Sequence, residues 1–371
     1  MNHSKKFYTR QPIILTSASF VRVLILILST ALMLMGCHGD EPLPKGKYEH
    51  GIIVINEGNF GAANGSVTFY SAPSGDVEQN IFRNDAGDFA GEVVQSLTLD
   101  GDIGYMVING DNKIEIVNHN TFKSLGTLSD ELLDKPKYIQ IMGRQAYVSV
   151  LGPYEEGGYS LVDSYVLVFD LDTKEVVKKI ETDEGTENLL LAGQYLFASN
   201  YNYGGSNTVA IIDIATNTLE DQLEVGSGPA GLVADVNGDI WVLCEGDFGG
   251  ANGTLVRINP NTLQVEKTID LHVNPYTDLA ITPDGENLVY TAEGSVFMIS
   301  ISAETAPDEP LFIAGNVVNT YALDINPENG DIWIGDAVNF ASVGSVFIYD
   351  AEGVFKTSFT AGINPRQFTF K

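Results

Sequence analysis

The sequence is poor in cysteine and histidine, and these shortages narrow the chemistry that it can carry out. It contains 2 cysteines, Cys37 and Cys244, and 5 histidines that do not cluster along the chain. It has no GxSxG, HExxH, CxxC or Walker sequence. The common hydrolase, metalloprotease, redox and nucleotide-binding signatures are therefore missing. We expect a protein that is not an enzyme and that holds no metal or cofactor.

Basic residues are also scarce, with 20 Lys and Arg against 49 Asp and Glu. Four of the basic residues and none of the acidic ones lie in residues 1–36. The rest of the chain therefore has 16 basic and 49 acidic residues, a formal net charge of −33. Such a field repels phosphate groups, so the charge excludes a nucleic acid partner. The acidic residues do not follow EF-hand spacing.

The first 36 residues are typical of an export signal. A basic segment precedes an apolar run that is too short for a comfortable membrane span. The sequence Leu34-Met35-Gly36-Cys37 then resembles a bacterial lipoprotein cleavage box, although Met35 is an unusual residue at its position. The alternative is an ordinary secretory signal with an incidental cysteine.

The lipoprotein interpretation predicts three parts of the chain. Residues 1–36 form the signal peptide, residues 37–50 a tether lipidated at Cys37, and residues 51–371 the folded domain. The acidic residues after Cys37, Asp40 and Glu41, resemble the export signal of Bacteroidetes surface lipoproteins. We therefore expect a lipid anchor in the outer membrane and exposure at the cell surface. Cys244 then has no disulfide partner, and its position at the end of an apolar run predicts a buried free thiol.

With 38 glycines and few helical periodicities, the remaining chain is typical of a turn-rich β protein. A unit of short strands recurs every 42–50 residues from Gly51. Its clearest marker is a third strand followed by an Asp/Asn-Thr or Ser-Gly turn, which alternates apolar and polar residues. The best copies are Val166–Ile180, Val209–Leu223 and Leu255–Ile269, with four weaker ones at Val67–Ile81, Ile114–Leu128, Val296–Phe312 and Val346–Phe359.

The first unit lacks its first strand, and an extra first strand, Arg366–Phe370, ends the chain. The C-terminal strand is therefore expected to complete the first unit and close a ring. Seven four-stranded units of this period predict an all-β, seven-bladed β-propeller. A pair of β-sandwiches would not explain the incomplete terminal units. Trp241 and Trp333 occupy equivalent places in second strands, and we expect both to pack between blades.

One glycine-rich loop occurs twice, at Asn56–Tyr70 and Cys244–Ile258, with seven identities in the first twelve positions. It joins a second to a third strand, and five of the seven loops of this kind are long and carry aromatic residues. Function on a propeller is expected on such an elaborated face. Phe60 and Phe248 either contact a ligand as a pair across this face or fold back under their own loops.

The predicted ligand-binding residues combine these loop side chains with residues that begin the first strands: Phe60, Asn64, Lys137, Tyr154, Tyr159, Asn188, Tyr201, Tyr203, Phe248, Asn252, Tyr321, Phe340, Arg366 and Gln367. Aromatic rings and amides suit a large polar ligand. Lys137 and Arg366 either meet an anionic group or, as we favour, pair with Glu187 and Asp278. His272 is a metal ligand or, as we favour, a solvated loop residue.

The mature chain resembles the YncE-like propeller lipoproteins of Bacteroidetes, from GIIVINEGNFGAANGSVTFY at its start to NPRQFTF at its end. It is similar in particular to the BtuG group, which captures cobalamin at the cell surface. This resemblance implies that the protein binds cobalamin or a related corrinoid and passes it to an outer-membrane TonB-dependent transporter. A surface glycan is the alternative ligand. A lactonase- or lyase-like centre built from Glu187, His272 and Arg366 is the third hypothesis.

Overall fold

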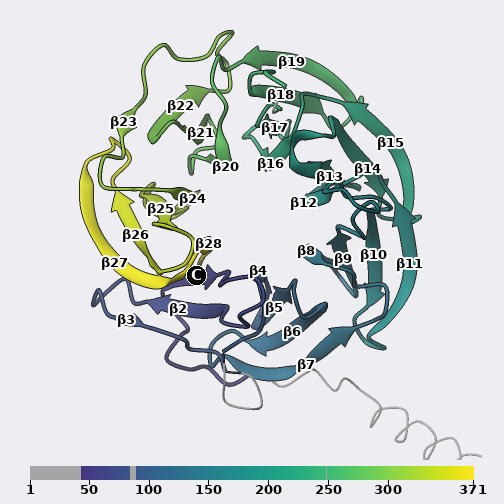
Figure 1. The fold of residues 1–371 in the computed structure, drawn as a ribbon, viewed down its shortest axis with the longest axis vertical. Helices are drawn as coiled ribbons and strands as arrows, with labels where there is room; N and C mark the ends of the chain where they lie inside the picture. Colours follow the sequence, from purple (N-terminus) through teal and green to yellow (C-terminus); the bar gives the residue numbers. More distant parts are fainter. Residues whose placement is uncertain (1–42, 84–88, 248) are drawn as a thin grey trace, which may run out of the picture. The chain divides into compact units, whose positions relative to one another are not determined.

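The computed structural model describes residues 43–83, 89–247 and 249–371. Within it, Pro44–Lys371 form one compact unit of seven four-stranded antiparallel sheets arranged in a ring (Figure 1). The predicted seven-bladed β-propeller is therefore confirmed. In the described part of the chain, no helix is both long enough and apolar enough to cross a membrane. The predicted signal peptide and Cys37 lie outside the described residues.

Each blade runs from an inner strand at the centre of the ring to an outer strand at its rim (Figure 1). Blade 1 contains β28 (Pro365–Phe370), β1 (Ile52–Asn56), β2 (Ser66–Tyr70) and β3 (Val77–Glu78). Blade 2 contains β4 (Val94–Asp100), β5 (Ile103–Ile108), β6 (Lys113–Asn118) and β7 (Lys123–Ser129). Blade 3 contains β8 (Pro136–Met142), β9 (Gln145–Val150), β10 (Tyr165–Asp170) and β11 (Glu175–Glu181).

The other four blades repeat this order. Blade 4 contains β12 (Thr186–Ala192), β13 (Tyr195–Asn200), β14 (Thr208–Asp213) and β15 (Thr218–Glu224), with a short 3-10 helix η1 (Asn202–Gly204) after β13. Blade 5 contains β16 (Pro229–Ala234), β17 (Ile240–Cys244), β18 (Thr254–Asn259) and β19 (Gln264–Asp270). Blade 6 contains β20 (Tyr276–Ile281), β21 (Asn287–Ala292), β22 (Ser295–Ser300) and β23 (Phe312–Ile313). Blade 7 contains β24 (Thr320–Ile325), β25 (Ile332–Asp336), β26 (Val343–Tyr349) and β27 (Phe355–Ile363).

The two ends of the compact unit meet in blade 1. The C-terminal strand β28 pairs with β1 in antiparallel register, with Ile52 opposite Phe370, as the incomplete terminal units predicted. Residues 44–50, expected as the end of the tether, pack against the propeller. The ring of Tyr48 is buried against Phe69, and the ammonium of Lys371 donates a hydrogen bond to the carbonyl of Tyr48. Closure gives β1 a paired strand on each side, β28 and β2.

The repeated turn between third and fourth strands has a local cause. The residue that ends the third strand in blades 3, 4 and 5 is Asp170, Asp213 or Asn259. Its side-chain oxygen Oδ1 accepts hydrogen bonds from the backbone N–H groups two and three residues later, at 2.8–3.3 Å. This Asx turn reverses the chain with its backbone donors satisfied. The sequence therefore encodes each hairpin locally.

The hydrophobic core is divided among the blade interfaces. The described residues form seven apolar clusters, one between each pair of neighbouring blades. Trp241 packs against blade 6, and Trp333 packs against the aromatic rings of Phe368 and Phe370 from blade 1. Both indoles are buried, which confirms the predicted positions between blades.

The two tryptophans differ in one hydrogen bond, and this difference gives a matched prediction. The indole Nε1–H of Trp241 donates to Oδ2 of the buried Asp235 at 2.9 Å, whereas Nε1 of Trp333 has no partner among the described residues. Trp241→Phe should therefore cost about 1–3 kcal/mol more than Trp333→Phe, because it also leaves a buried carboxylate oxygen unpaired. Urea unfolding of both variants measures this difference, and equal losses would contradict it.

Candidate functional site

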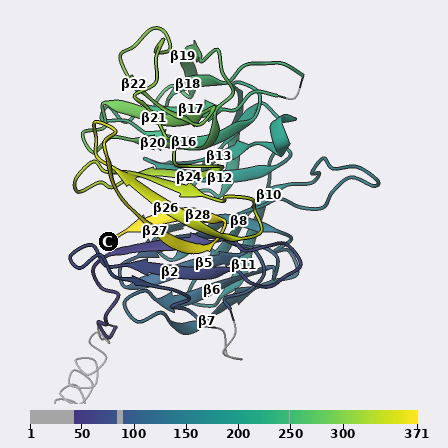
Figure 2. The same ribbon diagram turned by 60° about the vertical axis from the view of Figure 1, so that its left-hand side comes forward.

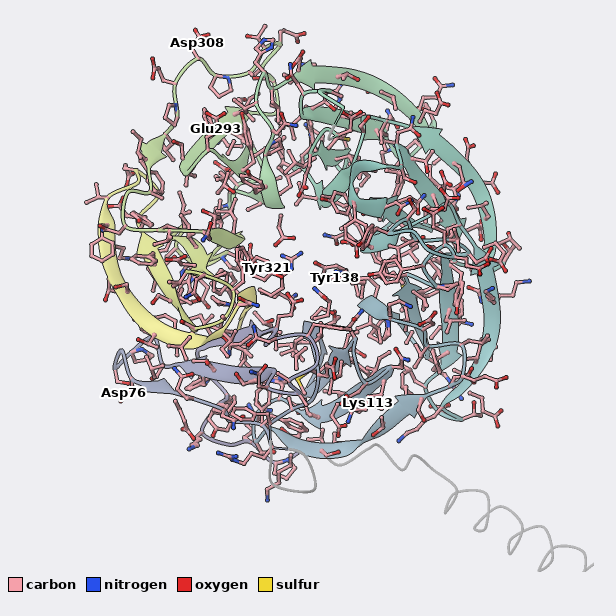
Figure 3. The ribbon with its side chains drawn as sticks, viewed as in Figure 1. Asp76, Lys113, Tyr138, Glu293, Asp308 and Tyr321 are labelled. Carbon is pink, nitrogen blue, oxygen red and sulfur yellow. The ribbon has the colours of Figure 1, made fainter. Side chains whose placement is uncertain are left out.

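The long loops between second and third strands surround a cavity at the centre of the ring. This central cavity has a volume of about 580 Å³ and is lined by inner-strand residues and by loop residues that follow β13, β17 and β25. Figure 3 shows Tyr138 and Tyr321 at the centre of the ring. Its lining includes seven predicted site residues: Lys137, Asn188, Tyr201, Tyr203, Tyr321, Phe340 and Arg366. The structure thus brings half of the predicted set together.

Arg366 spans the central cavity from blade 1. Its guanidinium Nη1 lies 2.8 Å from Oδ2 of Asp278 in blade 6, and Nη2 donates to the hydroxyl of Tyr138 in blade 3 at 2.9 Å. Burial acts to lower the pKa of Arg366, but the charge of Asp278 and the neighbouring phenols raise it well above its usual value. The guanidinium therefore remains charged and links three blades.

Lys137 is the second cation in this cavity, and it is also paired. Its ammonium lies 3.6 Å from the carboxylate of Glu187, and both side chains are 15% exposed. The pairing favoured from the sequence is therefore found for both Lys137 and Arg366. Since each cation already has a carboxylate partner, the central cavity offers no unpaired positive charge to an anion.

Each of the two repeated loops carries a glutamate that accepts a hydrogen bond from a tyrosine. The residues predicted from the sequence to bind a ligand included neither glutamate. In blade 1, Glu57 accepts a hydrogen bond from the hydroxyl of Tyr321. In blade 5, Glu245 accepts one from the hydroxyl of Tyr201 at 2.8 Å. In each case the tyrosine belongs to the preceding blade of the ring. The identity of Glu57 and Glu245 in the two loop copies was the signal that could have identified them.

The pKa of the Glu245 carboxyl is set by opposing effects. Burial raises its pKa to about 7, and the hydrogen bond from Tyr201 and the charge of Arg366 oppose this rise in part. Burial, followed by the charge of Glu245, raises the pKa of Tyr201, so its hydroxyl stays protonated and donates. A carboxyl that titrates near neutral pH inside a cavity is a candidate ligand contact.

Two side chains that line the central cavity have groups free to contact a ligand. The Asn188 side-chain amide has no hydrogen-bond partner among the described residues, and it lines the cavity beside Glu187. Phe340 is 47% exposed and meets the ring of Tyr321 edge to face, with centroids 5.6 Å apart. An amide and an exposed ring suit polar and apolar parts of one ligand.

Tyr154 and Tyr159 lie in a separate, outer cavity of about 910 Å³ between blades 3, 4 and 5. Tyr203 lines both cavities, and its hydroxyl lies 3.0 Å from that of Tyr154. Figure 2 shows the loop that precedes β10 projecting from the ring. The predicted site is thus divided into two neighbouring compartments.

Four further predicted site residues lie outside both cavities. Phe60 is 89% exposed, which excludes the alternative that its ring packs under its own loop. The Asn64 side chain accepts from the backbone of Asn59, and Asn252 donates to Asp270. The Gln367 side chain accepts from the backbone N–H of Leu97 in blade 2. Asn64 and Gln367 thus hold backbone in place, whereas Asn252 binds a side-chain carboxylate. Phe248 lies outside the described residues.

Of the three residues considered for catalysis, Glu187 and Arg366 line the central cavity and His272 does not. His272 is exposed on the loop between β19 and β20, where its ring lies 3.2 Å from Asp270, and it does not line the central cavity. Arg366 is engaged by Asp278 and Tyr138. Across the described residues, no group of three His, Cys, Asp or Glu side chains is placed to hold a metal ion. Cys244 is buried, as predicted, and burial raises the pKa of its thiol to about 11.

Comparisons with known proteins extend over nearly the whole propeller. The family described as "Domain of unknown function (DUF5074)" matches residues 50–360. A quinonprotein alcohol dehydrogenase-like protein from Bacteroides thetaiotaomicron VPI-5482 has a similar structure, with a TM-score of 0.68 and 13% identity over 87% of this chain and 78% of that chain.

The hydrazine synthase of Kuenenia stuttgartiensis aligns with a TM-score of 0.54 and 14% identity, over 75% of this chain and 92% of that chain. No curated protein matches the sequence. At these identities the two structures establish a shared propeller fold and carry no information on ligand or reaction.

Proposed function

This chain belongs to the DUF5074 family, and we propose that it is a non-catalytic binding protein for a large polar ligand, with cobalamin or a related corrinoid as the first candidate. The observation that carries this proposal is the central cavity, whose volume of about 580 Å³ falls in the range of small-molecule sites. Tyrosine rings, amides and carboxylates line it together, and its two cations are paired within the protein.

The chemistry of the lining favours a ligand that is rich in hydrogen-bond donors. The carboxylates of Glu187 and Glu245 accept hydrogen bonds, and their partners in the protein leave further lone pairs available. Asn188 supplies both a donor and an acceptor. The amide rim of a corrinoid has complementary N–H and C=O groups, and the exposed ring of Phe340 suits its apolar parts. The resemblance to the BtuG group supports the same candidate.

Equilibrium titration tests this function directly. We expect the purified protein to bind cyanocobalamin with one-to-one stoichiometry and micromolar or tighter affinity. No heat or absorbance change at micromolar ligand would overturn the corrinoid proposal. A glycan array run in parallel separates the second ligand class, because glycan binding without corrinoid binding would reassign the ligand while retaining a binding function.

Asn188 provides a residue-level prediction. Asn188→Leu removes an amide from the central cavity without breaking a hydrogen bond within the described structure, so the fold should be retained. We expect affinity for cyanocobalamin to fall about tenfold, the value of one hydrogen bond to a buried ligand group. The matched control is Gln222→Leu on the exposed outer strand β15, which should bind as the wild type does. Equal affinities for the two variants would remove Asn188 from the site.

The cellular role that we propose is capture at the cell surface and transfer to an outer-membrane TonB-dependent transporter. It rests on the lipoprotein-like sequence around Cys37 and on the acidic residues that follow it. Cys37→Ser should abolish labelling by radioactive palmitate and release the protein from membranes. Protease treatment of intact cells distinguishes surface exposure from an inward-facing anchor, since an inward-facing domain would be protected.

A further inference from the structure

The outer cavity differs from the central one in its chemistry. Its walls carry the three phenol rings of Tyr154, Tyr159 and Tyr203, and glycines form part of its surface. The one acidic residue in its lining is Asp247, whose carboxylate Oδ1 accepts from the backbone N–H groups of Gly249 at 2.7 Å and Ala251 at 2.9 Å. The described lining has no cationic side chain. The lining is therefore aromatic with one carboxylate, and the ammonium of Lys135 lies 5.5 Å from the centroid of the Tyr154 ring.

The three tyrosine rings of the outer cavity are exposed rather than buried. Tyr159 is 89% exposed, Tyr154 45% and Tyr203 42%. Tyr203 and the preceding Asn202 both have left-handed backbone, with φ of 52° and 40°. The side chain of Asn202 fixes this turn, because its Oδ1 accepts from the backbone N–H of Leu161 at 2.9 Å. The fold thus maintains an unfavourable backbone that presents the ring of Tyr203.

Tyr203 also connects the two compartments. It lines the outer cavity together with Tyr154 and the central cavity together with Tyr201, whose ring centroid lies 6.2 Å away. The hydroxyl contact between Tyr154 and Tyr203 lies in the outer cavity. Because Tyr203 belongs to both linings, a ligand in the central cavity that extends past this ring would enter the outer cavity.

We propose that the outer cavity is a second subsite, which binds a flat, uncharged ring of the same ligand whose donor-rich part occupies the central cavity. Exposed phenol rings stack on flat ring systems, and the described lining offers no cation that would pair with an anionic ring. This proposal rests on the binding function proposed above, and it adds that the ligand has two parts.

The first experiment uses benzimidazole, an uncharged flat ring at pH 7.5, in saturation-transfer NMR. The wild type should transfer saturation to the probe, and Tyr159→Ser should reduce the transfer at least threefold. Tyr159 has no contact that maintains the fold, so this variant should remain folded. Ile313→Ser, at a position 72% exposed on β23 and outside both cavities, is the matched control and should behave as the wild type does. No transfer, or equal transfer in all three proteins, overturns the subsite.

The second experiment separates this subsite from the corrinoid function. Tyr159→Ser should lower affinity for cyanocobalamin about tenfold, as expected for one lost ring contact, and leave affinity for cobinamide, which lacks the nucleotide base, unchanged. Equal effects on both ligands overturn the subsite and leave the corrinoid function intact. If neither ligand binds the wild type, the corrinoid function fails, and the benzimidazole experiment still decides the subsite.

Discussion

Replacing Arg366 with alanine is expected to lower the free energy of unfolding by about 3–5 kcal/mol, as found when one partner of a buried ion pair is removed. The guanidinium is 14% exposed and bridges Asp278 and Tyr138, so its loss leaves a carboxylate and a hydroxyl of two other blades without their partner. Urea unfolding monitored by circular dichroism measures the change. The inner ends of blades 1, 3 and 6 are then no longer linked by this side chain.

Two controls test whether the loss of stability arises because the ion pair is buried. Arg144→Ala removes a guanidinium that is 73% exposed and pairs with Asp172 at the surface, and its effect should stay below about 1 kcal/mol. Arg366→Met combined with Asp278→Leu should recover most of the loss, because a well-packed apolar pair replaces the ion pair. A loss below 1 kcal/mol for Arg366→Ala would show that the bridge contributes nothing to stability.

The second large effect is on the pH dependence of stability. Burial raises the pKa of both Glu245 and Asp324 to about 7, so each carboxyl binds a proton more readily in the folded than in the unfolded chain. The native state therefore binds more protons between pH 5 and 7, and stability rises as the pH falls from 8 to 5. Each group should contribute about 2 kcal/mol over this window. His119 opposes the trend below its usual pKa, because burial lowers the pKa of its imidazole.

Asp324 lies at the opposite end of the inner strands from the central cavity. It lines a third cavity of about 550 Å³, where its carboxyl is largely buried while part of the residue remains open to solvent. Its carboxylate Oδ1 accepts from the backbone N–H of Ile325 at 2.8 Å, and no cation pairs with it among the described residues. The ionised form is therefore poorly compensated.

Neutral variants isolate these two groups. Asp324→Asn and Glu245→Gln should each be more stable than the wild type at pH 8 by about 2 kcal/mol, and the difference should close towards pH 5. Glu220→Gln on the exposed strand β15 should follow the wild-type profile throughout. Thermal unfolding across this pH range measures all four proteins. A variant that is less stable than the wild type at pH 8 would show that its carboxylate is favourably bound when ionised.

The sequence specified the architecture because the propeller is encoded locally. Each blade has its own alternation of apolar and polar residues in sequence, and blades such as 3 and 4 have their own Asx turn, at Asp170 and Asp213. The units can therefore be counted along the chain. The displaced strand at 366–370 indicated closure for the same reason. The tryptophans and the buried cysteine followed from their places in second strands.

The site was only partly contained in the sequence. Loop length and aromatic content indicated a candidate face, and Tyr201, Tyr203, Tyr321 and Phe340 from that prediction line the central cavity. Which side chains converge depends on where the strands of different blades begin around the ring. Arg366 and Asp278 are separated by 88 positions, and they meet because ring closure places the C-terminal strand in blade 1. No local sequence pattern encodes this contact.

The same limit explains the amides and glutamates. Asn64, Asn252 and Gln367 have the composition of ligand contacts, but their hydrogen bonds to nearby backbone and side chains are fixed by tertiary packing. Glu57 and Glu245 acquire their phenol partners from a neighbouring blade, and burial is the main cause that raises the pKa of Glu245 to about 7. The sequence by itself determined the fold and the face that carries the long loops, because those follow from short-range periodicity. Only the tertiary structure decided the charge balance and the division into two cavities, because those depend on contacts between blades.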